Sequence, residues 1–91
     1  MKLEEREINK RLKKLDGWNH KDNALQVSYE FDDFKDAFTA MTRIAFEAEK
    51  LQHHPNWSNV YNNLEIELTT HDEGGVTKKD FELAELIDEL N

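Results

Sequence analysis

Hydrophobic and polar positions follow two periods along the chain and divide it into helical and extended segments. Apolar side chains recur three and four residues apart in three segments, residues 3–14, 34–52 and 77–90, which predicts amphipathic helices. Strands are predicted where apolar residues alternate singly with polar ones or where the chain runs extended. These segments run from Trp18 to a turn at 21–23, over 24–31, over 57–62 and from residue 64 onward. The order helix, two strands, helix, two strands, helix predicts an α+β fold, with helices covering one face of an antiparallel sheet.

Local signals mark where these elements begin and end. Asp16-Gly17 ends the first helix, and Asp32 or Asp33 can cap the second. Pro55 is expected to stop the second helix, because the residue before a proline avoids the helical region. Asn62-Asn63 is a candidate two-residue hairpin turn, and Thr77-x-x-Asp80 reads as a capping box that opens the last helix.

The long central helix is expected to bury one apolar stripe. Phe46 lies off that stripe, on the polar side of the helix, which favours a second contact surface. The expected stripe consists of Phe34, Ala37, Phe38, Met41, Ile44, Ala45, Ala48 and Leu51.

Length and composition narrow the class of protein. The 91 residues fit one domain, residues 1–91. The absence of cysteine excludes a disulfide framework and a cysteine nucleophile, and favours a reducing compartment. A net charge of −8 would repel a phosphate backbone, so we expect no nucleic-acid partner. No apolar run approaches the roughly 20 residues of a membrane span and no signal peptide is visible, so we expect a cytoplasmic protein.

Three of the four histidines are candidates for chemistry. His53 and His54 end the long helix, and His71 is expected at the end of a strand, on its polar face. Imidazole titrates near neutral pH, so such a cluster can supply both a general acid and a general base. Two plainer interpretations remain open: a polar helix end that binds the last carbonyls, or a zinc site, which lacks an obvious fourth ligand. Glu49, one turn before His53, either pairs with it or makes a solvated contact.

Three motifs together resemble the pterin-4a-carbinolamine dehydratase family. Residues 49–62 are similar to its signature E-K-x-x-H-H-P-x-W followed by N-V-Y-N. Residues 70–80 are similar to its second block, T-H-x-x-x-G-[VL]-[ST]-x-x-D, and residues 15–18 to its L-x-G-W. The resemblance covers nearly the whole chain, with the H-H-P-x-W block as its most specific part.

The resemblance implies a hydro-lyase. Aromatic amino-acid hydroxylases leave their tetrahydropterin as a 4a-hydroxy adduct, and the family dehydrates this adduct to quinonoid dihydropterin, with no metal or cofactor. By the family pattern, the catalytic residues His53, His54 and His71 line the pterin pocket. We expect His53 and His71 to be the acid–base pair, and His54 to bind or orient the substrate. The substrate-binding set that the pattern implies is His54, Pro55, Trp57 and Asp80. Taken from the residues alone, Asp80 is a helix cap and Trp57 a core or interface aromatic; as a family member, Asp80 could also hold a histidine in the right tautomer.

The resemblance also implies a fold and an assembly. Family members have a four-stranded antiparallel sheet with helices on one side, and they form homodimers by joining sheets edge to edge. Some pair again through the long helix, for which Phe46 is the candidate contact. Two other functions stay open: a non-enzymatic interaction protein, such as a dimerisation cofactor for a homeodomain transcription factor, and a pterin enzyme in another pathway, such as molybdopterin metabolism.

Overall fold

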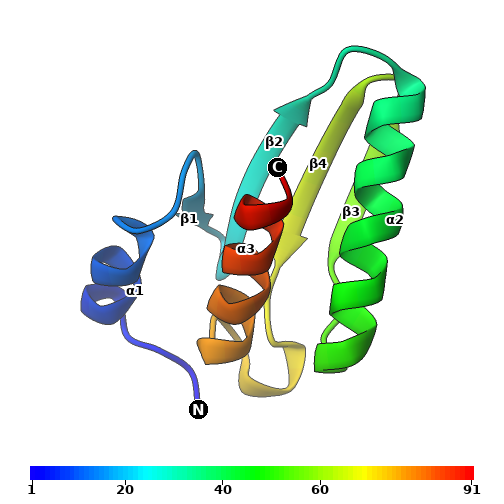
Figure 1. The fold of residues 1–91 in the computed structure, drawn as a ribbon. Coiled ribbons are helices and arrows are strands. Elements are labelled where there is room, and N and C mark those ends of the chain that lie inside the picture. Colours follow the sequence, from blue (N-terminus) through cyan, green and yellow to red (C-terminus); the bar gives the residue numbers. More distant parts are fainter.

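The computed structural model describes all residues, 1–91, and contains the predicted order of helices and strands (Figure 1). One short 3-10 helix, η1, was not predicted. No helix of the structure combines the length and apolar character needed to cross a bilayer. The elements are α1 (Glu5–Leu12), β1 (Asn19–Lys21), β2 (Ala24–Glu30), α2 (Phe34–Leu51), β3 (Asn56–Val60), β4 (Asn63–Leu68), η1 (His71–Glu73) and α3 (Lys78–Leu90).

The four strands form one antiparallel sheet in the order β1-β2-β4-β3, which confirms the predicted fold class. Ile66 of β4 lies at the centre, with Val27 of β2 on one side and Trp57 of β3 on the other. Helices α2 and α3 lie together on one face of this sheet (Figure 1). Strands β1 and β3 are the two edges, and β3 is the longer edge.

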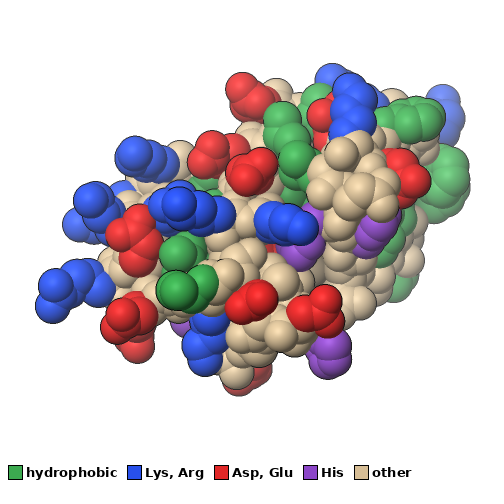
Figure 2. All heavy atoms as spheres, turned by 90° about the horizontal axis from the view of Figure 1, so that it is seen from below, with side chains coloured by type: hydrophobic (Ala, Val, Ile, Leu, Met, Phe, Trp, Pro, Cys, Tyr) green, Lys and Arg blue, Asp and Glu red, His purple; other side chains and the backbone are tan.

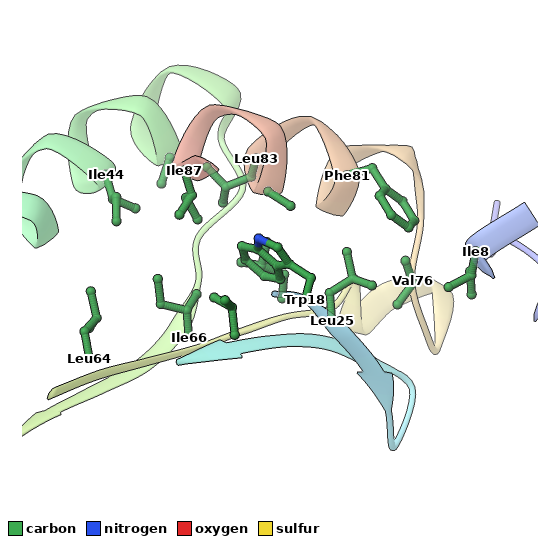
Figure 3. Close-up of a cluster of buried hydrophobic side chains, with 14 residues drawn as sticks. Ile8, Trp18, Leu25, Ile44, Leu64, Ile66, Val76, Phe81, Leu83 and Ile87 are labelled. Atoms are coloured by element: carbon green, nitrogen blue, oxygen red, sulfur yellow. The ribbon is translucent and has the colours of Figure 1, made fainter. Parts of the chain in front are cut away.

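The core lies between this face of the sheet and the two helices (Figure 3). The alternating residues of β4 point into it, and Leu64 and Leu68 have no exposed surface. Burying one such side chain stabilises the fold by about 1.5–3 kcal/mol. The buried cluster consists of Ile8, Trp18, Leu25, Val27, Ile44, Ala48, Leu64, Ile66, Leu68, Val76, Phe81, Leu83, Ala84 and Ile87.

The buried stripe of α2 is narrower than predicted. Ala37, Ala40, Ile44 and Ala48 are its buried residues, so Ala40 was missed. Phe34 and Phe38 were expected inside but are 46% and 55% exposed, and Ala45 is exposed too. The spacing of three, four and four residues follows one line along the helix, and most of its members are small, so the helix packs closely while the flanking rings stay outside. The rings of Phe34 and Phe38 pack against each other, with centroids 5.7 Å apart.

Both ends of α2 are defined by local hydrogen bonds. Asp33 is the N-cap, and its Oδ1 accepts from the backbone N–H of Asp36 at 2.8 Å. At the other end Gln52 has a left-handed φ of 54°, and the N–H of His53 donates to the carbonyl of Ala48 at 3.1 Å. This is a Schellman ending. The helix therefore ends at Leu51, before the chain reaches Pro55, and the prediction that Pro55 stops it was wrong.

The two hairpins turn through residues with positive φ. Asp22 and Asn23 have φ of 53° and 64°, within the predicted turn. The second turn lies at Tyr61 and Asn62, one residue earlier than predicted, because Val60 pairs with Asn63 in the sheet. The side-chain amide of Asn59 bridges this turn by donating to the carbonyls of Tyr61 (3.0 Å) and Asn63 (2.8 Å).

The carboxylate of Asp88 ties the end of α3 to two other segments. Its Oδ1 accepts from the indole N–H of Trp18 at 2.8 Å and from the hydroxyl of Tyr29 at 3.0 Å. Its Oδ2 accepts from the backbone N–H of Asp16 at 2.9 Å. Burial, and then the hydrogen bond to Asp88, raise the pKa of Tyr29 well above its ordinary value.

Candidate active site

His53 and Asp80 form the central contact of the site. The Schellman ending of α2 turns the chain back and buries the imidazole of His53, which is 9% exposed. Asp80 lies in the first turn of α3 and has no exposed surface. Nε2 of His53 lies 2.5 Å from Oδ1 of Asp80. The end of one helix and the start of another are therefore joined by a buried contact between side chains.

The second carboxylate oxygen of Asp80 is also fully used. Oδ2 accepts from the backbone N–H of Thr77 at 2.8 Å and from the hydroxyl of Thr70 at 2.9 Å. The Thr77 contact completes the predicted capping box, in which the Thr77 hydroxyl accepts from the N–H of Lys79 at 3.3 Å. Three donors around one carboxylate satisfy its buried oxygens, and no buried side-chain nitrogen or oxygen of the structure lacks a partner.

This arrangement assigns different tasks to the two ring nitrogens of His53. A carboxylate accepts hydrogen bonds, so Nε2 carries the proton that lies between the two groups. Nδ1 has no partner in the protein, and because every buried nitrogen has one, Nδ1 lies in contact with solvent. The imidazole therefore presents Nδ1 to solvent, where it can accept a hydrogen bond when the ring is neutral and donate one when the ring is protonated.

His54 lies at the surface beside Glu49. Nε2 of His54 is 2.9 Å from Oε1 of Glu49, and the side chains are 59% and 71% exposed. The hydrogen bond from His54, together with its charge, lowers the pKa of Glu49. The expectation that Glu49 could pair with His53 was wrong, since His53 turns inward to Asp80 after the helix has ended.

His71 is exposed and opens the short helix η1, so its predicted place at the end of a strand was wrong. Strand β4 ends at Leu68, because Thr70 pairs with Gly75 in an isolated bridge and closes a tight loop. Gly74 ends η1 with a left-handed φ of 75°. Thr70, which binds Asp80, is the chain neighbour of His71, and this is the link between His71 and the pair formed by His53 and Asp80.

Figure 2 views the end of the molecule where α2 stops and α3 begins. Histidine side chains lie across this end, among carboxylates and a basic side chain. The structure has no group of three or more histidine, aspartate or glutamate side chains that could hold one metal ion. His53, His54 and His71 thus lie at one end of the fold, without forming a site for one metal ion.

Pro55 and Trp57 follow His53 and His54 in the sequence, where the chain leaves α2 and enters β3. Pro55 is half-buried between His54 and the start of β3. Trp57 is half-buried within β3 and packs against the core. It also borders a hollow of about 450 Å³ on the sheet, which is lined mostly by polar side chains of the strands.

The contribution of Thr70 was not predicted, because the alternation from residue 64 onward indicates only a strand and names no partner for this hydroxyl. A hydroxyl at the end of an apolar row must find a buried partner, and this requirement was the available signal. That partner is Asp80, together with the hydroxyl of Thr77 at 2.7 Å.

Comparisons with known proteins agree over the length of the chain. A family model described as pterin 4 alpha carbinolamine dehydratase matches residues 1–90. A protein of Christiangramia forsetii named "Putative pterin-4-alpha-carbinolamine dehydratase" is 58% identical over 89 residues, which are 98% of this chain and 92% of the relative. One of the same name from Solibacter usitatus is 49% identical over 98% of this chain and 94% of its own. The crystal structure of a transcriptional coactivator/pterin dehydratase from Brucella melitensis superposes with a TM-score of 0.96 at 42% identity, covering 99% of this chain and 98% of that one.

Proposed function

The chain belongs to the pterin 4 alpha carbinolamine dehydratase family, and from that premise we propose that it dehydrates 4a-hydroxytetrahydropterin to quinonoid dihydropterin. The observation that carries the proposal is the buried contact between His53 and Asp80. It fixes the imidazole of the H-H-P-x-W motif with one nitrogen anchored and the other free. Such an imidazole suits general acid–base catalysis, which this reaction requires.

The reaction needs two proton transfers and no nucleophile. A general acid gives a proton to the 4a-hydroxyl, the bond between C4a and oxygen breaks, and water leaves. A general base removes the proton from the neighbouring ring nitrogen, and the C=N bond forms. Each transfer by a positioned imidazole contributes about 10²–10⁴-fold to the rate. The proposed reaction requires no metal or cofactor, because the pterin is the substrate.

We assign the two transfers to His53 and His71. The anchored ring of His53 offers Nδ1, and the exposed ring of His71 is free to approach a ligand at the same end of the fold. His54 is held by Glu49 at the surface and is proposed to bind or orient the pterin. Asp80 acts through His53, since none of its surface is accessible to a substrate. Pro55 and Trp57 are proposed to shape the adjoining wall.

The test is to generate the 4a-carbinolamine and follow its loss with and without the protein. We expect acceleration by the parent, a large loss in H53A and H71A, and a smaller loss in H54A. H20A is the matched control, because His20 lies in β1, outside the site. A parent without activity would refute the dehydratase proposal. An active parent with fully active H53A and H71A would refute the assignment of the residues.

A second candidate function is favoured by the outer surface of α2. Phe34, Phe38 and Phe46 are between 46% and 67% exposed on this helix, and such exposed aromatic surface is typical of protein contacts. The similar protein of Brucella melitensis is described as a transcriptional coactivator as well as a pterin dehydratase. A protein-interaction role would be independent of the histidines, so binding to a partner should survive H53A and fail in F46D.

We also propose that the chain forms a homodimer by sheet extension, and a homotetramer through α2. Strand β3 is the longer of the two edges and offers unpaired backbone groups to a second copy. Phe46, 67% exposed, is the proposed centre of the helix contact.

A further inference from the structure

We infer that Thr70 is a positioning residue, whose hydroxyl couples the loop that carries His71 to the buried pair formed by Asp80 and His53. This inference rests on the proposed function, because it assigns a task in the same site. The hydroxyl of Thr70 makes its hydrogen bonds to Asp80 and Thr77, and to neither imidazole. It acts through the carboxylate of Asp80, to which it donates at 2.9 Å.

The direction of the hydrogen bonds follows from counting protons. Thr70 has one hydroxyl proton, which goes to Oδ2 of Asp80. The 2.7 Å contact between the hydroxyls of Thr70 and Thr77 must then be donated by Thr77. Thr77 in turn accepts from the N–H of Lys79. A single directed chain therefore runs from the first turn of α3 through two hydroxyls to the carboxylate that holds His53.

The hydroxyl of Thr70 limits how the carboxylate can turn. The terminal torsion of an aspartate is broad, so one hydrogen bond alone leaves its plane poorly defined. The N–H of Thr77 and the hydroxyl of Thr70 both bind Oδ2, and this leaves Oδ1 directed at Nε2 of His53. Without the hydroxyl, the carboxylate and the ring it anchors gain rotational freedom.

The backbone of Thr70 is equally engaged in the loop that contains His71. Its N–H donates to the carbonyl of Gly75 at 2.9 Å, and its carbonyl accepts from Glu73 (3.0 Å) and Gly75 (3.4 Å). Displacement of this loop must therefore displace the hydroxyl that binds Asp80. The two proposed catalytic imidazoles are linked through this one residue.

The test compares T70V, which removes the hydroxyl at nearly constant shape, with T70S, which restores it. T69V is the matched control, because the hydroxyl of Thr69, one position earlier, donates to the carbonyl of Asn23 and not to Asp80. Turnover of the carbinolamine is measured together with the ¹⁵N NMR signals of the His53 ring, which report its tautomer.

We expect T70V to lower kcat about 10–100-fold, the range typical when a group that orients a functional histidine is lost. KM should change far less, since the substrate contacts remain. The His53 signals of T70V should show a mixture of tautomers. T70S should recover most of the rate and the single tautomer, and T69V should behave like the parent.

The inference would be overturned if the parent is active and T70V has the same rate and the same His53 tautomer as T69V. A parent that does not dehydrate the carbinolamine would instead refute the proposed function, and the tautomer measurement would still decide the role of Thr70. If T70V does not fold, the hydroxyl proton of Thr70 in the parent decides: slow exchange with water supports the bond to Asp80, and exchange at the rate of a free hydroxyl overturns it.

Discussion

Asp80 and His53 are separated by 27 positions in the sequence, yet Oδ1 of one lies 2.5 Å from Nε2 of the other. The same carboxylate closes the capping box of α3 through the N–H of Thr77. One side chain therefore both starts a helix and holds an imidazole, so its loss should affect folding and catalysis together.

The substitution D80N should show both effects. The amide has one acceptor oxygen and one donor nitrogen, so its NH₂ faces either the N–H of Thr77, which can only donate, or Nε2 of His53, which can accept only if the ring takes its other tautomer. We expect a loss of about 1–3 kcal/mol in the free energy of unfolding, as for an unsatisfied buried group. The rate should fall about 10–100-fold. Urea unfolding and the carbinolamine assay measure these effects.

D33N is the matched control for that experiment. Asp33 is the N-cap of α2, where asparagine caps as well as aspartate. D33N should therefore keep the stability and the rate of the parent. If D80N were indistinguishable from D33N, the buried contact would have no energetic or catalytic weight.

The contact between His54 and Glu49 predicts a titration at low pH. Glu49 has its pKa lowered from 4.5, first by the hydrogen bond from His54. In H54A, the pKa of Glu49 should return toward 4.5, which ¹³C NMR of its carboxyl carbon can follow. H20A should leave this titration unchanged, and an equally unchanged titration in H54A would contradict the contact.

The lowered pKa of Glu49 also determines how its contribution to the stability of the protein depends on pH. A carboxyl whose pKa is lower in the folded protein stabilises it above the unfolded pKa of 4.5. That contribution is lost as the pH falls through the lowered value. The side chain of Glu49 is 71% exposed, so screening by solvent keeps the contribution small.

Tyr29 predicts a loss of stability at alkaline pH. Burial and then Asp88 raise its pKa above the ordinary 10.0, so the unfolded chain releases this proton before the folded chain does. The free energy of unfolding should therefore decrease as the pH rises above 10, and continue to decrease up to the raised pKa. In Y29F this decrease should be weaker, as measured by urea unfolding at several pH values between neutrality and about pH 11.

Y61F is the control for Tyr29, because Tyr61 is 61% exposed in a turn. Its alkaline profile should match that of the parent. Equal profiles in all three proteins would show that the hydroxyl of Tyr29 does not titrate as its surroundings require.

Phe46 predicts the size of the assembly. If dimers pair through α2, a charged side chain at position 46, which is 67% exposed, should separate the two dimers. F46D should then have half the mass of the parent by light scattering at micromolar concentration, with unchanged circular dichroism. K10D, on α1 and away from α2, should keep the parental mass. A parent that is already monomeric would refute both proposed contacts.

Much of the fold could be predicted from the sequence, because it depends on local patterns. The alternation in β4 and the capping box of Thr77 and Asp80 each involve neighbours within a few residues, and the structure confirms both. The end of α2 was predicted to within one residue but its cause was not, because Gln52 adopts a left-handed conformation that glycine normally provides. Phe34 and Phe38 were misplaced, because the width of a buried stripe depends on how closely the helix approaches the sheet.

For the candidate site, the identity of the residues could be predicted from the sequence, but their arrangement could not. His53, His54 and His71 could be named from their motifs, and Asp80 as a residue that could hold a histidine, but not which histidine Asp80 or Glu49 would contact. The choice of Asp80 by His53, and of Glu49 by His54, depends on the direction in which the chain leaves α2. Thr70 was missed because its partner lies ten positions away, across a loop whose closure through Gly75 has no simple sequence signal.

The indole of Trp18 provides a natural optical probe of this molecule. Trp18 is 6% exposed, and its indole N–H is bound to Asp88 near the end of α3. Fluorescence from Trp18 should therefore shift to longer wavelength when the last turns of α3 detach from the sheet. With W57F as the background, a single emission band would follow that detachment in real time, without any attached dye.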